Sequence, residues 1–217
     1  MKRNLLLIFF ALMACIGMTN MASASELAVV SVYPSSINVP APGNTFQVNI
    51  TIANVVNETG VHGGVFGWDL SLSWNGSVLS VAKDEFGDWM VVEGPFLKSL
   101  VPPGKTLFLF SPPTPYCIAD ISCAFLQKKE AFGSGTLVSI TFNATAVGNT
   151  EIRIGNLTLE DYPGNNIPCT VVNGTVAVIP EFPASMTIPL FLIATTITAV
   201  MAKIAWSRRR REHIDFF

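Results

Sequence analysis

The sequence has few charged residues and almost no histidine. Charged residues make up 13% of its 217 positions, and histidines number two. Zinc sites built from histidine and cysteine need several such residues at short spacing, and the sequence has no such set. His62 lies in a Gly-rich turn, but no Gly-x-Ser-x-Gly elbow accompanies it. We therefore expect no catalytic residues, and we interpret His62 as a loop residue.

Basic residues are scarce between the two apolar ends of the chain. Residues 25–185 contain 6 lysines and arginines against 13 aspartates and glutamates, a net charge of −7. A nucleic-acid-binding face needs clustered cations, so this composition argues against nucleic acid as a partner. The acids at 84, 85 and 88, and those at 160 and 161, are neighbours in the sequence and are interpreted as solvated turns. They are not the opposed carboxylates of a glycosidase.

Helical periodicity is lacking before the C-terminal tail, whereas strict alternation recurs. Residues 138–144 place Val138, Ile140, Phe142 and Ala144 on one side and hydroxyl or amide residues on the other. A period of two is typical of a half-buried strand. Residues 66–74 alternate in the same way and direct both of their tryptophans, Trp68 and Trp74, inward. The predicted strands cover residues 27–33, 46–52, 66–74, 78–81, 107–110, 122–127, 138–144, 151–154, 157–159 and 170–179.

Short strands at this spacing, separated by Gly/Pro turns, predict an all-β jelly-roll sandwich of about nine strands over residues 25–179. A body of roughly 150 residues can bury a proper core without metals or extra staples. The fold class is therefore predicted from periodicity alone.

The N-terminal end has the order of a secretory signal peptide. Lys2 and Arg3 precede an apolar run at 5–18, and small residues at 22–24 provide a cleavage site after residue 24. A lipoprotein box at residues 12–15 is the alternative, but Met13 fits that box poorly. We expect residues 1–24 to be removed and the body to be exported.

The C-terminal end predicts a membrane anchor. Residues 188–206 form an apolar run long enough to cross about 30 Å of hydrocarbon, and four arginines follow at 208–211. A buried core helix is the alternative, and it is disfavoured because a basic block directly after the run is typical of the cytoplasmic side. We expect a single-pass protein of the cell membrane with its N-terminal domain outside and residues 207–217 as a basic cytoplasmic tail.

Six Asn-x-Ser/Thr sequons lie in the exported body. Such triplets also arise by chance, but two of them fall on the polar side of an alternating strand, where a glycan would stand in solvent. The candidate glycosylation sites are Asn49, Asn57, Asn75, Asn143, Asn156 and Asn173.

Three cysteines remain after signal removal, in a compartment that permits disulfides. Cys117 and Cys123 are six residues apart, close enough in sequence to close a loop, and their pairing is our prediction. Cys169 is the odd cysteine and could displace either partner.

The sequence offers candidates for two kinds of ligand site, a carbohydrate-binding surface and a Ca²⁺ site. Carbohydrate modules stack sugar rings on flat exposed aromatic faces, and the aromatics in irregular segments are the candidates. These are Trp89, Phe96, Tyr116 and Tyr162. Ca²⁺ takes six to eight oxygen ligands, and the turn with Asp161, Asn165 and Asn166 is the candidate for that ion. No other cofactor is expected.

The C-terminal end also resembles the archaeal PEF-type sorting signal. Pro180, Glu181 and Phe182 precede the apolar run and the arginine block in that signal's order. The resemblance implies processing near residues 180–187 by an archaeosortase-like enzyme and attachment to a lipid at the cell surface. Residues 212–217, which extend past the basic block, depart from the pattern.

Four pieces of the body, taken in order, resemble the cohesin family, whose fold is close to that of cellulose-binding modules. They are VYPSSI at 32–37 with PGNTF at 42–46, GWDLSLSW at 67–74 with SVL at 77–79, the Gly-bounded strand at 133–148, and the hairpin at 159–174. The resemblance implies a nine-stranded jelly-roll module that performs no chemistry. It binds a dockerin-like protein in our first hypothesis, and a polysaccharide in the alternative. The Pro-rich stretch 101–123 departs from a compact cohesin.

Overall fold

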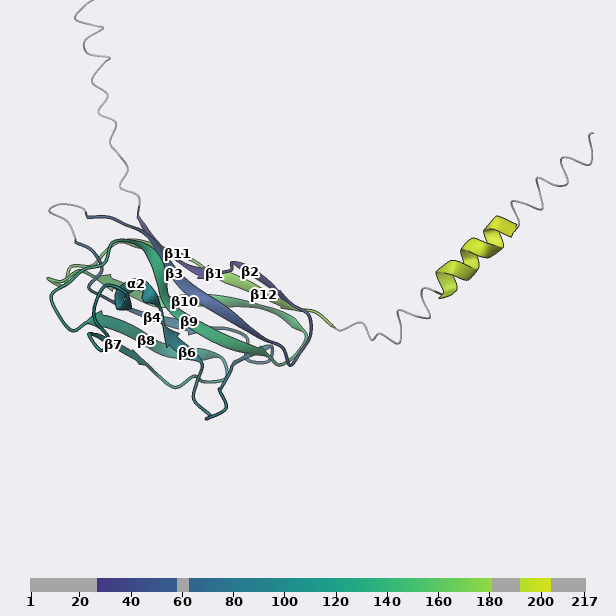
Figure 1. Ribbon diagram of the computed structural model, residues 1–217, viewed down its shortest axis with the longest axis horizontal. Helices are drawn as coiled ribbons and strands as arrows, with labels where there is room; N and C mark the ends of the chain where they lie inside the picture. Colours follow the sequence, from purple (N-terminus) through teal and green to yellow (C-terminus); the bar gives the residue numbers. More distant parts are fainter. Residues whose placement is uncertain (1–26, 58–62, 181–191, 204–217) are drawn as a thin grey trace, which may run out of the picture.

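The computed structural model describes residues 27–57, 63–180 and 192–203, and the first two segments form two β-sheets packed face to face (Figure 1). The first sheet, sheet A, has the strand order β11-β1-β3-β9-β5, and β6 also pairs with β9. Its strands are β1 (Ala28–Tyr33), β3 (Thr45–Val55), β5 (Leu79–Val81), β6 (Val91–Glu93), β9 (Gly133–Ala144) and β11 (Cys169–Val172). The alternating residues 138–144 lie in β9 of this sheet.

The second sheet, sheet B, has the strand order β2-β12-β10-β4-β8-β7. Its strands are β2 (Ser36–Val39), β4 (Gly67–Ser73), β7 (Thr106–Phe110), β8 (Cys117–Phe125), β10 (Gly148–Glu160) and β12 (Gly174–Val178). One short helix, α2 (Pro95–Lys98), connects β6 to β7. The predicted all-β sandwich is confirmed.

The strand count is higher than the expected nine, because the described residues form twelve strands. Residues 151–154 and 157–159 join into β10, whose pairing with β4 shifts register between Gly155 and Thr158. Residues 170–179 divide at Asn173 into β11 and β12, which lie in different sheets. Gly174 lies so close to Val32 that a Cβ there would come within 2.4 Å of it. A side chain at position 174 would therefore force the Val32 side chain to move.

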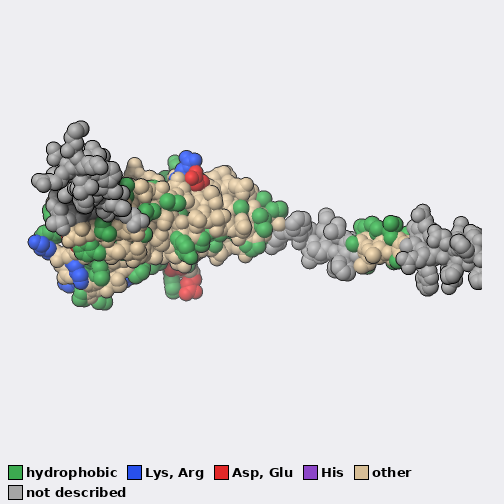
Figure 2. Space-filling model, turned by 90° about the horizontal axis from the view of Figure 1, so that it is seen from above, with side chains coloured by type: hydrophobic (Ala, Val, Ile, Leu, Met, Phe, Trp, Pro, Cys, Tyr) green, Lys and Arg blue, Asp and Glu red, His purple; other side chains and the backbone are tan. Residues whose placement is uncertain are grey.

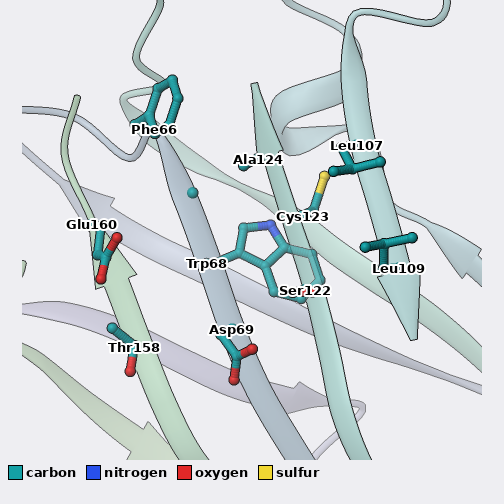
Figure 3. Close-up of a pocket in the computed structure, with 11 residues that line it drawn as sticks. Phe66, Trp68, Asp69, Leu107, Leu109, Ser122, Cys123, Ala124, Thr158 and Glu160 are labelled. Carbon is teal, nitrogen blue, oxygen red and sulfur yellow. The ribbon is translucent and has the colours of Figure 1, made fainter. Parts of the chain in front are cut away.

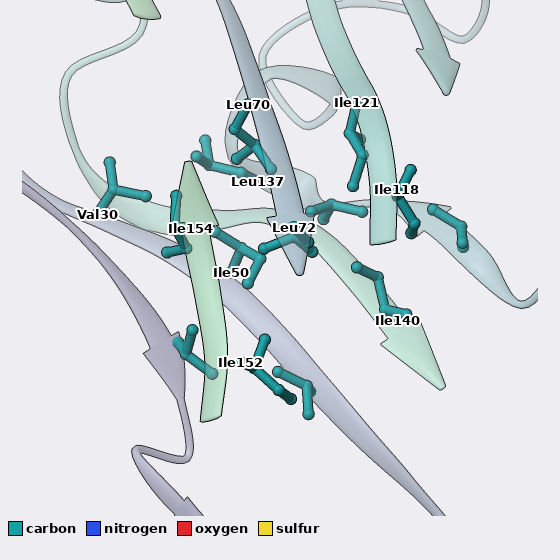
Figure 4. Packing of buried hydrophobic residues seen from close by; sticks show 14 of the residues in the cluster. Val30, Ile50, Leu70, Leu72, Ile118, Ile121, Leu137, Ile140, Ile152 and Ile154 are labelled. Carbon is teal, nitrogen blue, oxygen red and sulfur yellow. The ribbon is translucent and has the colours of Figure 1, made fainter. Parts of the chain in front are cut away.

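Apolar side chains from both sheets meet in one core (Figure 4). Ile50 and Ile140 of sheet A face Leu72 and Ile152 of sheet B, and all four are fully buried. Every member of the core cluster lies between Ala28 and Val178. Trp68 and Trp74 are buried as predicted, and the Trp74 indole nitrogen donates hydrogen bonds to the backbone oxygens of Leu79 and Pro115. The sandwich thus contains its own complete hydrophobic core.

The surface of the sandwich carries few charged side chains on the face seen in Figure 2. Residues 192–203, within the predicted membrane segment, form a helix whose side chains are all exposed. Among the described residues, no helix combines the length and the apolar character needed to cross a membrane. The signal peptide, Glu181 and Phe182 of the sorting motif, His62 and the basic tail lie outside the described residues.

Phe142 tests the core directly. It is fully buried on β9, stacks on Phe46 with 5.9 Å between ring centroids, and meets the Trp74 ring edge-on at 5.0 Å. Phe142→Ala is expected to lower the free energy of unfolding by about 3–5 kcal/mol, because it removes this packing and leaves a cavity. Phe86→Ala is the matched control, since that ring is 81% exposed, and its expected effect is within about 0.5 kcal/mol. Chemical denaturation measures both, and equal losses would contradict the assignment of the core.

Candidate functional site

A shallow groove lies on the outer face of sheet B, over strands β10, β4, β8 and β7 (Figure 3). Its volume is about 220 Å³. The residues around it are Phe66, Gly67, Trp68, Asp69, Leu107, Leu109, Ser122, Cys123, Ala124, Thr158 and Glu160. The volume of the groove is less than the 300–1,000 Å³ of a typical small-molecule site, so the groove suits a few side chains of a partner molecule.

Small residues on the two central strands produce the hollow. Gly67 of β4 pairs with Ala124 of β8, and a Cβ on Gly67 would approach the Ala124 Cβ to 3.2 Å. Ala124 in turn pairs with Leu107 on β7. On the other side Gly67 pairs with Glu160 of β10. The floor is therefore backbone and methyl groups, with longer side chains rising on both sides.

The wall formed by β7 is apolar and exposed. Leu107 and Leu109 point outward with 47% and 55% of their surface accessible, while Phe108 and Phe110 pack against the core. β7 is the last strand of sheet B, and its described partner is β8 alone. Two leucines side by side on an edge strand provide an apolar surface that a partner could cover.

The opposite side of the groove is acidic. Asp69 pairs across the sheet with Ser122 on one side and Thr158 on the other, with Asp120 and Glu160 close by. Burial raises the pKa of Asp69 to about 6, and a hydrogen bond to the Asp120 carboxyl and repulsion from Asp120 and Glu160 act in the same direction. The groove therefore combines an apolar wall with carboxylates that disfavour one another's ionisation.

Cys123 lies beneath the groove, with its side chain turned into the core. Its thiol donates a hydrogen bond of 3.5 Å to Glu93, whose carboxylate is 3.9 Å from the Lys98 ammonium. Burial, followed by the negative charge of Glu93, raises the pKa of Cys123 to about 12. The thiol therefore stays protonated at neutral pH and is a structural side chain rather than a nucleophile.

The predicted disulfide between Cys117 and Cys123 is wrong. Both residues lie on β8, near opposite ends of one extended strand. Six residues of strand span roughly 20 Å, far beyond the Cα separation that a disulfide tolerates. The three described cysteines, Cys117, Cys123 and Cys169, are all free.

The predicted Ca²⁺ ligands do not form an oxygen cage. The Asp161 carboxylate accepts hydrogen bonds from the backbone nitrogens of Gly63 and Asn165 and from the Asn165 amide nitrogen. Burial would raise its pKa, but the hydrogen bonds from Asn165, Gly63 and Gly164 outweigh burial and hold the pKa below its ordinary value. Asn166 is exposed beside this turn. Asp161 is thus surrounded by N–H donors and organises the loop, and Ca²⁺ binding at this turn stays a prediction.

The four aromatic candidates do not form a sugar-binding platform. Phe96 is buried, which contradicts its assignment as an exposed ring. The ammonium of Lys83 lies 4.1 Å from the ring centroid of Trp89, which is itself half-buried, and that of Lys128 lies 4.7 Å from the ring centroid of Tyr162. Tyr116 is 62% exposed. A cation over a ring occupies the face that a sugar would stack on.

Sequence reasoning missed the residues that make the groove. The alternation of residues 66–74 places Asp69 on the outer side of its strand without assigning it to a site, and residues 107–110 are predicted only as a strand. The pattern that indicates this face is the alternation of β4, which places Gly67, Asp69 and Ser71, every second residue, on its outer side. Which strands flank β4 could not be read from that pattern.

Solved structures of cohesins share this fold. A non-cellulosomal cohesin from the archaeon Archaeoglobus fulgidus matches with a TM-score of 0.54 at 19% identity, covering 75% of this chain and 98% of that one. A chain of a type I cohesin–dockerin complex from Clostridium thermocellum matches with a TM-score of 0.54 at 18% identity, covering 73% and 98%. The sixth cohesin of scaffoldin B from Acetivibrio cellulolyticus, solved with a dockerin, matches with a TM-score of 0.53 at 15% identity, covering 71% and 100%.

The body of the chain therefore has a cohesin-like fold. No protein-family model matches the sequence, and no curated protein is significantly similar to it.

The electrostatics of the groove predict an unusual pH dependence for Asp69→Asn. The folded-state pKa of about 6 exceeds the ordinary value of 3.8, so the folded state holds a proton that the unfolded chain releases. The protonated Asp69 carboxyl therefore makes its full contribution to the stability of the fold below about pH 4, and this contribution is lost as the pH rises through about 6. We expect the substitution to raise the melting temperature at pH 7 by about 2–4 °C, roughly 1 kcal/mol after allowance for solvent screening, and to change little at pH 4.

Differential scanning calorimetry at both pH values measures this difference. Glu85→Gln, which removes an exposed carboxylate from a loop, is the control and should leave both melting temperatures unchanged. A melting temperature for Asp69→Asn that is lower than the wild-type value at pH 7 would show that the carboxylate stabilises the fold.

Proposed function

We propose that the chain is a non-catalytic protein-binding module that receives a dockerin-like partner in the groove of sheet B. The observation that carries this proposal is the groove itself, in which Leu107 and Leu109 stand opposite Asp69 and Glu160 across a floor of small residues. A partner that suits it presents apolar side chains to the leucines and a hydrogen-bond donor or a cation to the carboxylates.

Relatives in fold support the kind of partner. Three of the similar chains come from solved complexes of a cohesin with a dockerin. Their sequence identity to this chain is 14–18%. They therefore support a dockerin-like protein as the kind of partner, and the particular partner is to be found by experiment.

The carbohydrate alternative has less support. Sugar-binding surfaces need several exposed aromatic faces in one plane. Tyr116 lies before β8, whereas the exposed Phe86 lies in the loop between β5 and β6 and Tyr33 ends β1 in the other sheet. These rings are distributed over separate parts of the fold and do not continue into the groove.

Display at the cell surface completes the proposal. The order of a signal peptide, an exported acidic body, the motif at 180–182, an apolar segment and an arginine block supports export and anchoring at the C-terminal end. Cleavage near residues 180–187 by an archaeosortase-like enzyme, with transfer to a lipid, is the variant of anchoring that the motif favours.

Ala124→Arg tests the groove. Ala124 lies on the floor of the groove between Gly67 and Leu107, so an arginine side chain there would fill the groove and exclude the partner. With the full chain as bait against the proteome of its own organism, we expect a dockerin-like protein to be captured and the variant to bind it at least tenfold more weakly. Thr141→Arg is the matched control, because it adds the same charge to the outer face of sheet A. Equal binding by both variants would place the partner elsewhere.

Cell fractionation tests the anchor. The full chain is expected in the membrane fraction and should resist extraction at alkaline pH, since an apolar segment of this length partitions into lipid. A chain ending at residue 187 should appear in the medium instead. Recovery of the full-length chain from the medium would contradict anchoring and would leave the binding proposal untouched.

A further inference from the structure

The outer face of sheet A differs from the groove in having uncharged hydroxyl and amide side chains. On its three central strands the outward positions include Ser31, Gln47, Thr51, Ser139 and Thr141. Ser31 and Thr51 share a hydrogen bond of 2.9 Å between their hydroxyl oxygens. Two sequon asparagines, Asn49 and Asn143, belong to this same face.

Both of these asparagines leave the nitrogen that would carry a glycan available. Asn49 pairs with Ser139 across β3 and β9, and its Oδ1 accepts a hydrogen bond of 2.7 Å from the Ser139 hydroxyl. Among the described residues, its Nδ2 donates to no protein atom, and neither amide atom of Asn143 is hydrogen-bonded. Side chains on the outer face of a sheet stand away from it, so each Nδ2 can reach solvent.

Asn173 is the contrasting sequon. Its Oδ1 accepts a hydrogen bond of 3.1 Å from the Ile154 backbone nitrogen, and its Nδ2 donates one of 3.0 Å to Glu151. These two hydrogen bonds hold Asn173, where the chain passes from β11 in one sheet to β12 in the other, against β10. A glycan on this Nδ2 would crowd the Glu151 carboxylate to which the nitrogen donates, at a position beside Gly174, which is itself packed against Val32.

The remaining sequons lie at the ends of strands or at an irregularity. Asn57 follows β3 and Asn75 follows β4, and both are exposed. Asn156 occupies the β10 register shift with a φ of 44° and is exposed. Strands β4, β7 and β8, which form the floor and the apolar wall, contain no sequon asparagine.

We propose that Asn49 and Asn143 are N-glycosylated, so that glycans cover the outer face of sheet A, and that Asn173 is left unmodified. In this reaction Nδ2 forms a bond to the anomeric carbon of a lipid-linked oligosaccharide. The anomeric C–O bond to the lipid phosphate carrier breaks, its electron pair leaves with the phosphate oxygen, and one amide proton is released. The consequence is a module with glycans over the outer face of sheet A, whereas the strands that form the floor and apolar wall of the groove carry none.

Glycopeptide mass spectrometry of the full chain, produced in a secretory cell that N-glycosylates its exported proteins, tests this assignment. Thr51→Val and Thr145→Val each destroy one sequon while keeping the asparagine, and each is expected to remove one glycan. Thr51→Ser and Thr145→Ser preserve the sequons and should restore it, which separates loss of modification from loss of folding.

Thr175→Val is the matched control, because it destroys the sequon of Asn173 and should leave the mass of the glycans unchanged. Unmodified Asn49 and Asn143 in the wild-type chain, or loss of a glycan on Thr175→Val, would overturn the proposal. The readout is the mass of each peptide, so its outcome does not depend on whether the groove binds a partner.

Discussion

The structure depends on the contact between two sheets whose inward positions are apolar at every second residue. Ile50 and Ile140 on one side meet Leu72 and Ile152 on the other, and this burial supplies most of the free energy that holds twelve short strands together. The same period of two commits the intervening residues to the outer faces. Each strand that builds the core therefore also presents a second row of side chains to solvent, and both of our proposals concern these outer rows.

The two outer faces diverge in chemistry because nothing in the core constrains them. On sheet A, hydroxyls and amides such as Thr51 and Asn49 form hydrogen bonds to their neighbours. On sheet B, Gly67 and Ala124 lower the floor between Leu107 and Glu160. Burial, followed by the neighbouring carboxyl groups of Asp120 and Glu160, raises the pKa of Asp69, which costs stability at neutral pH.

Much of the fold was predictable from the sequence, because alternation is a local property. The strands around Phe46, Trp68 and Phe142 were expected within a few residues of their observed bounds. The inward phase of Trp68 and Trp74 was also correct. What alternation cannot give is the lateral order of strands, so it did not predict that β8 and β10 flank β4.

The site predictions without support share that cause. The disulfide prediction assumed a loop between Cys117 and Cys123, but pairing with β4 keeps this stretch extended. The calcium prediction assumed that Asp161 faces oxygen atoms. A donor from Gly63, 98 residues away in the sequence, instead occupies the carboxylate. The disulfide prediction failed, and the calcium prediction gained no support, because contacts across the sheet or from a distant loop determine the environment of these residues.

Hydrogen–deuterium exchange of the full chain, with and without the protein that it captures, tests the central claim most directly. The account predicts slower exchange on binding in β7 and β8, whose outward side chains would be covered, and no change in β3 and β9. Protection confined to β3 and β9 would instead place the partner on the outer face of sheet A, and would contradict the division of the sandwich into a binding face and a glycan-bearing face.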